Sequence, residues 1–103
     1  MNSTKIISND NNLLQNISKE FIFASETVKK LAKKPDNEEL LNLYGLYKKT
    51  TIGNINIDKP NILNFKEYGK WNAWNNCKFS NKEAEIEYIK LVNILIEKYE
   101  VNE

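Results

Sequence analysis

Four successive segments of this chain repeat apolar residues at the spacing of an α-helix. In the first segment, Phe21, Ala24, Val28 and Leu31 follow the i, i+3, i+7, i+10 pattern of one buried stripe. No segment shows the strict alternation of polar and apolar residues that is typical of a half-buried strand. The pattern therefore predicts an all-α chain in which four helices pack into one bundle.

Capping residues indicate where the first two helices begin and end. The first is expected to begin at Ser18, a typical N-cap residue, and to run to about Lys34, just before a proline. The second is expected to begin at a capping box formed by Asp36 and Glu39. It should close by residue 52, because Gly53 can adopt the left-handed conformation that follows many helices.

A long loop and two further helices are expected in the second half. Residues 54–64 contain a proline and are expected to form a loop that wraps over a packed surface. The third helix is expected over 65–77, and Gly69 within it should permit the close approach of a partner helix or a ligand. The fourth is expected to begin at a second capping box, Ser80 with Glu83, and to run to about residue 100.

The length of 103 residues indicates one domain, which we expect over residues 18–103. Residues 1–17 are mostly polar and are expected to form a flexible leader. They contain no apolar block of the kind found in signal peptides, and no run approaches the roughly 20 apolar residues of a membrane-spanning helix. The sequence therefore predicts a cytoplasmic protein without stable membrane insertion, and we expect a monomer.

The residue inventory argues against catalysis and against nucleic acid as a partner. The chain has no histidine, and Cys77 is its only cysteine, so neither a nucleophile–base pair nor a zinc site is expected. All 15 basic residues are lysines and the net charge is only +1, which does not favour binding to a nucleic acid. We therefore expect no enzyme activity, no bound metal and no cofactor.

Two strings of residues are more specific than the helical pattern. The pattern YxxYKxxTxGxxN begins at Tyr44, and the pattern KWxAWN begins at Lys70. With the surrounding residues, from about 18 to 100, these strings resemble the acyl-CoA-binding protein family. The loop 78–80 is one residue shorter than the family pattern.

The resemblance implies an up-down-down-up bundle of four helices that carries medium- to long-chain fatty acyl-CoA through the cytoplasm and maintains a pool of it. It also implies acyl-CoA-binding roles for seven residues, which are Lys29, Tyr44, Tyr47, Lys48, Lys66, Lys70 and Tyr88.

These residue types suit the chemistry of such a ligand. An acyl-CoA is a phosphorylated nucleotide joined to an apolar chain, so a binder needs cations and aromatic rings at one end and an apolar groove at the other. Tyr44 and Lys48 lie one turn apart on their helix. We expect Lys48 and Lys70 to converge on the 3′-phosphate, while tyrosine hydroxyls donate hydrogen bonds and tyrosine rings flank the adenine.

Other readings of the same residues stay open. At least one of Trp71 and Trp74 is expected to serve mainly in core packing, and tyrosines and lysines at these positions also suit a helix surface. An alternative function is a helical interaction module that uses the same fold to dock a protein or nucleic-acid partner through its lysines, although the net charge disfavours nucleic acid. A third reading, an acyl-CoA-processing enzyme, is disfavoured because the chain has no room for a catalytic domain and no histidine.

Overall fold

The computed structural model describes residues 17–102, and this range contains four α-helices. They are α1 (Lys19–Thr27), α2 (Asn37–Thr51), α3 (Phe65–Asn75) and α4 (Asn81–Tyr99), with a 3-10 turn, η3 (Val28–Lys30), directly after α1. Within the described range the only β-type pairing is an isolated antiparallel bridge between Leu31 and Val101. The predicted all-α class is confirmed. Residues 1–16 of the predicted leader lie outside the described residues.

The predicted starts of α1, α2 and α4 are confirmed by their capping hydrogen bonds. The Ser18 hydroxyl accepts a hydrogen bond from the backbone N–H of Phe21, at 3.1 Å. Full capping boxes are present at the start of α2 and of α4, where the N-cap side chain and the glutamate three residues later bond each other's backbone N–H. At the end of α2, Gly53 has a φ of 102°. This positive φ is the left-handed backbone conformation that was expected at this glycine.

The first helix is shorter than predicted. It was expected to reach Lys34, but the α-helix ends at Thr27 and the 3-10 turn η3 follows it. Beyond the turn the chain is extended and pairs with the C-terminal segment, where Ala32 donates to the Glu100 carbonyl at 2.7 Å and Asn102 donates to the Lys30 carbonyl at 2.8 Å. This pairing takes the backbone groups that a longer helix would have bonded within itself.

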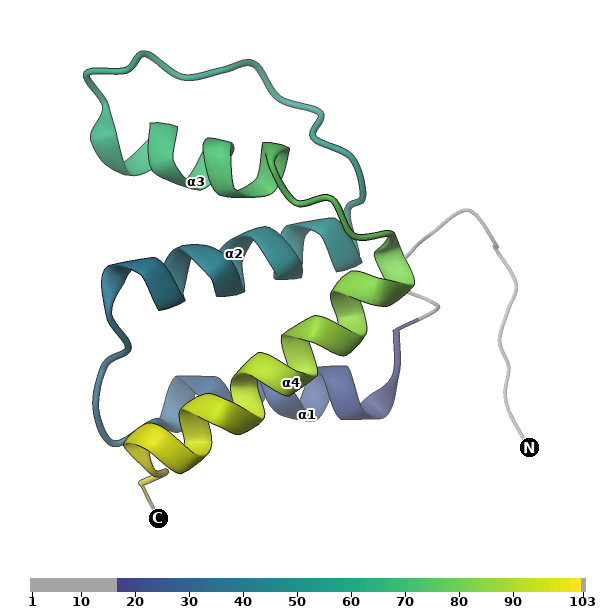
Figure 1. Cartoon of the computed structure of the whole chain (residues 1–103), viewed down its shortest axis with the longest axis vertical. Helices are drawn as coiled ribbons and strands as arrows, with labels where there is room; N and C mark the ends of the chain where they lie inside the picture. Colours follow the sequence, from purple (N-terminus) through teal and green to yellow (C-terminus); the bar gives the residue numbers. More distant parts are fainter. Residues whose placement is uncertain (1–16, 103) are drawn as a thin grey trace.

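The helices pack around α2 and α4. Helix α2 packs against α3 on one side and against α4 on the other. Helix α4 also packs across α1, which lies behind it in the view of Figure 1. The core cluster lies where α1, α2 and α4 meet. Its buried members are Phe21, Ala24, Leu43, Tyr88, Val92 and Leu95.

Helices α2 and α3 lie in tight backbone contact at a glycine, but not at the one expected. A Cβ atom on Gly45 of α2 would lie 2.7 Å from the Ala73 carbonyl oxygen, so only glycine fits there. A Cβ atom on Gly69 would meet only the Leu41 methyl groups, at 3.8 and 3.9 Å, which is ordinary contact. The prediction that Gly69 permits the close approach of a partner helix was therefore wrong, because the neighbouring helix leaves room for a Cβ atom there. The alternative, that Gly69 permits the close approach of a ligand, stays a prediction.

The loop 54–64 runs alongside α3 (Figure 1). The two tryptophans of α3 hold the loop and the residue that precedes it. The indole N–H of Trp71 donates to the Ile57 carbonyl at 3.0 Å, and that of Trp74 donates to the Gly53 carbonyl at 2.7 Å. Trp74 is buried, which confirms that at least one tryptophan serves in core packing.

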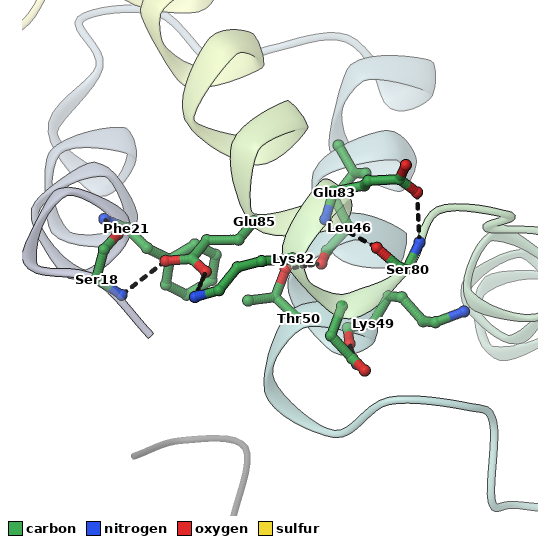
Figure 2. A network of polar contacts seen from close by, with 10 residues as sticks. Ser18, Phe21, Leu46, Lys49, Thr50, Ser80, Lys82, Glu83 and Glu85 are labelled. Carbon is green, nitrogen blue, oxygen red and sulfur yellow. Dashed lines mark hydrogen bonds and ion pairs between the residues drawn. The ribbon is translucent and has the colours of Figure 1, made fainter. Parts of the chain in front are cut away.

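A buried carboxylate fixes the start of α1 against α4 (Figure 2). Glu85 is only 4% exposed and accepts hydrogen bonds from the Ser18 backbone N–H at 2.6 Å and from the Lys82 ammonium at 3.0 Å. Burial raises the pKa of Glu85, but the hydrogen bonds from Ser18 and Lys82 outweigh burial and hold the pKa below its usual value. The carboxylate therefore stays ionised and keeps α1 in position beside the site.

Candidate functional site

A cavity of about 320 Å³ opens between α1, α2 and α4, and we call it the tyrosine cavity. Four of the seven predicted site residues line it, namely Lys29, Tyr44, Tyr47 and Tyr88. The remaining lining residues form an apolar wall and a small polar edge; they are Val28, Leu40, Leu43, Ser25 and Glu26.

Aromatic stacking positions the tyrosines of the cavity. The Tyr47 ring centroid lies 5.6 Å from that of Phe21 and 5.9 Å from that of Tyr88, and the Phe21 and Tyr88 centroids are 4.8 Å apart. Rings at these separations attract one another beyond simple burial. Burial raises the pKa of Tyr88 to about 12, and the neighbouring Tyr47 adds to the shift. The Tyr88 hydroxyl is therefore protonated at neutral pH and can donate a hydrogen bond.

Two ammonium groups from different helices lie beside the Tyr44 ring. The Lys48 Nζ is 5.9 Å from the ring centroid and the Lys70 Nζ is 5.6 Å from it. Lys48 follows Tyr44 by one turn of α2, whereas Lys70 reaches the ring from α3. The structure thus brings the two lysines that were expected to converge to the same tyrosine ring. We call Tyr44, Lys48 and Lys70 the lysine–tyrosine cluster.

One carboxylate lies within ion-pair distance of this cluster. Glu67 precedes Lys70 by three residues on α3, and its Oε2 is 3.7 Å from the Lys70 Nζ. Both side chains are about half exposed, so the pair contributes little to stability. The cluster retains a positive charge that is suited to an anion.

The structure does not bring all seven predicted residues together. Lys66 is exposed in the first turn of α3, and within residues 17–102 it makes no hydrogen bond, ion pair or ring contact. Lys29 lies at the edge of the cavity on η3 and is also exposed.

Two aromatic residues belong to the site although they were not predicted as part of it. The Lys48 Nζ lies 5.1 Å from the Trp74 ring centroid, closer than to Tyr44, and Phe21 stacks on both Tyr47 and Tyr88. Trp74 occurs in the motif that begins at Lys70, but spacing within one helix does not reveal which ring faces a lysine on the neighbouring helix.

The arrangement favours a ligand that is anionic and aromatic at one end and apolar at the other. The lysine–tyrosine cluster offers two cations and ring faces, and the tyrosine cavity next to it adds hydroxyl groups and an apolar wall. Across the described part of the chain, no group of three His, Cys, Asp or Glu side chains is arranged to hold a metal ion. No helix within residues 17–102 combines the length and apolar composition that crossing a bilayer requires.

The sequence matches the family described as acyl CoA binding protein over residues 18–92. It is 46% identical over 84 residues to the acyl-CoA-binding protein of Saccharomyces cerevisiae, a match that covers 81% of this chain and 97% of the yeast protein. The acyl-CoA-binding protein homolog of Drosophila melanogaster is 42% identical over 84 residues, covering 81% of this chain and 98% of the fly protein.

The fold is similar to solved structures as well. The crystal structure of acyl-CoA-binding protein 2 from Oryza sativa matches with a TM-score of 0.73 and 40% sequence identity, over 78% of this chain and 90% of the rice chain. Similarity in sequence and similarity in fold therefore point to the same family.

Proposed function

This chain belongs to the acyl-CoA-binding protein family, and from that premise we propose that it binds medium- to long-chain fatty acyl-CoA without converting it. We further propose that it works in the cytoplasm as a monomeric carrier that also maintains a pool of the ligand. The domain responsible is residues 18–103.

The observation that carries this proposal is the convergence of Lys48 and Lys70 on the Tyr44 ring, from two helices. In the proposed complex the two ammonium groups hold the ribose 3′-phosphate, and the adenine lies against tyrosine rings. At an effective dielectric near 20, a cation about 4 Å from a phosphate charge is attracted by roughly 4 kcal/mol before screening. Exposure and salt reduce that value considerably, so the head group alone gives modest affinity.

The remaining predicted residues complete the proposed site. Tyr47 and Tyr88 offer hydroxyl groups inside the tyrosine cavity, and Lys29 lies at its edge. On α3, Lys66 supplies a further cation one turn before Lys70. Tyr88 acts as a neutral donor, because its raised pKa of about 12 keeps the hydroxyl protonated.

The apolar wall of the tyrosine cavity receives the first part of the acyl chain in this proposal. Each methylene that leaves water contributes about 0.8 kcal/mol, so a chain of sixteen carbons supplies roughly 12 kcal/mol before entropic costs. The acyl chain, and not the nucleotide, should therefore dominate the affinity.

Calorimetric titration with free CoA and with acyl-CoAs of increasing chain length tests the proposal. We expect weak binding of free CoA and an affinity that rises with chain length until the chain extends beyond the protein. Equal affinity for free CoA and palmitoyl-CoA would contradict the division of roles between head and tail. Absence of binding to either ligand would favour the alternative of a protein-interaction module.

A further inference from the structure

Large apolar side chains are exposed where the long loop meets α3. Ile62, Leu63 and Phe65 are 61%, 78% and 77% exposed, although they lie within four consecutive positions. The loop and the start of α3 form an outer edge of the molecule (Figure 1). We call these three residues the loop corner. A concentration of exposed apolar side chains of this kind is typical of an interaction surface.

The backbone of the loop corner is held in an ordered conformation. The Asn61 side-chain oxygen accepts from the Leu63 backbone N–H at 2.8 Å, and the Asn61 carbonyl accepts from the Asn64 N–H at 2.9 Å. Upstream, the Trp71 indole fixes the Ile57 carbonyl at 3.0 Å. The apolar side chains are thus displayed by a turn that is already formed, so docking would require little further ordering.

Lysines flank the loop corner on both sides in the sequence. Lys59 lies against α3, with its Nζ 5.6 Å from the Tyr68 ring centroid and 6.0 Å from that of Trp71. Lys66 follows Phe65 directly and is exposed. Exposed Asp58 and the Glu67–Lys70 pair leave the charge balance of this region positive.

We propose that the loop corner docks on the surface of an anionic phospholipid bilayer. Its side chains would enter the boundary between head groups and acyl chains, while Lys59 and Lys66 face the lipid phosphates. Apolar side chains combined with flanking lysines are the features by which proteins associate with such a surface without crossing it. This inference goes beyond the proposed function and does not depend on acyl-CoA binding.

The test is sedimentation of the full chain with phosphatidylcholine vesicles that do or do not contain phosphatidylserine. The test variant is Leu63→Ser/Phe65→Ser. The matched control is Phe23→Ser/Ile94→Ser, which removes a phenylalanine and an aliphatic residue that are 71% and 60% exposed on α1 and α4. All four side chains are exposed, so both variants should fold, and circular dichroism checks this.

We expect the wild type to bind vesicles that contain phosphatidylserine more strongly than vesicles that lack it. The loop-corner variant should lose about tenfold or more in vesicle binding, and the control variant should match the wild type. Calorimetry with palmitoyl-CoA in lipid-free buffer should give the same affinity for all three proteins. That readout separates a failure of this inference from a failure of the proposed function.

Three results would each overturn the proposal. The first is no binding of the wild type to vesicles that contain phosphatidylserine, or equal binding with and without that lipid. The second is an equal loss of binding in the loop-corner and control variants. The third is self-association of the wild type in sedimentation velocity that the loop-corner variant abolishes, because the surface would then be a contact between two copies of the chain.

Discussion

Tyr44 connects the two parts of the candidate site. Its ring lies within 6 Å of both the Lys48 and the Lys70 ammonium groups, and its side chain also lines the tyrosine cavity. The affinity of the site for an anionic ligand depends on how much positive charge the two lysines present to it. Glu67 reduces that charge, because its carboxylate pairs with Lys70 at 3.7 Å.

Replacing Glu67 with Gln should strengthen acyl-CoA binding. The change releases the Lys70 ammonium from its exposed pair, and such pairs are worth at most about 1 kcal/mol. We expect affinity for palmitoyl-CoA to rise by no more than about fivefold, measured by calorimetry. Glu87→Gln is the matched control, because Glu87 pairs with Lys90 on α4. A lower affinity in Glu67→Gln would show that the carboxylate assists the site.

At the scale of elements, local signals predicted helix starts better than helix ends. Ser18 and the two capping boxes involve residues three apart, so their hydrogen bonds can be inferred from the sequence. The end of α1 could not be inferred, since it depends on pairing of Leu31 with Val101, 70 positions away. The contact between Gly45 and Ala73 is likewise determined by the packing of two helices.

Two Gly→Ala substitutions should affect stability in opposite directions. Gly45→Ala places a Cβ atom 2.7 Å from the Ala73 carbonyl, so we expect a loss of about 1–3 kcal/mol in the free energy of unfolding. Gly69→Ala meets only ordinary contacts, and should gain about 0.5–1 kcal/mol from its better helix propensity.

Urea unfolding followed by circular dichroism measures both effects. Because Gly45 sets the spacing of α2 and α3, Gly45→Ala should also weaken palmitoyl-CoA binding through the lysine–tyrosine cluster. Equal stability of the two variants would contradict the assigned role of Gly45.

At the scale of the whole molecule, the site is assembled from all four helices. Spacing placed Tyr44, Tyr47 and Lys48 near one another because they share α2, and the family resemblance added Lys29, Lys70 and Tyr88 from other elements. The positions of Trp74 beneath Lys48 and of Phe21 against the tyrosines required the packed structure. The resemblance also grouped Lys66 with the site, and within residues 17–102 no hydrogen bond, ion pair or ring contact connects its exposed side chain to the other six residues.

A second network connects the start of α2 with the end of α4. Glu39 accepts hydrogen bonds from the Lys98 ammonium at 2.8 Å, the Tyr99 hydroxyl at 2.7 Å and the Asp36 backbone N–H at 2.9 Å. The hydrogen bond from Lys98 contributes most, and together these bonds lower the pKa of Glu39 from 4.5 to about 2. A lowered pKa means that the unfolded chain binds the proton more tightly.

This network should make folding stability depend on pH in acid. The contribution of Glu39 is complete above about pH 4.5 and is lost as the pH falls towards about 2. We expect Glu39→Gln to lower the melting temperature near neutral pH and to reduce its decline between pH 4.5 and 2. The control is Glu38→Gln, because Glu38 is an exposed neighbour in the same helix. Parallel melting curves for wild type and Glu39→Gln over this window would exclude the network as a source of acid sensitivity.

A comparison of palmitoyl-CoA with palmitoyl-3′-dephospho-CoA tests whether Lys48 and Lys70 hold the 3′-phosphate. Each ligand is titrated by calorimetry into the wild type and into Lys48→Ala/Lys70→Ala, with Lys90→Ala as the control for loss of a surface lysine. Hydrogen bonds to charged groups contribute about 1.5–3 kcal/mol, so the wild type and the control should prefer the 3′-phosphorylated ligand by about tenfold or more. The double variant should bind both ligands with nearly the same affinity. If the double variant keeps the full preference of the wild type, Lys48 and Lys70 do not hold the phosphate and the proposed site is wrong.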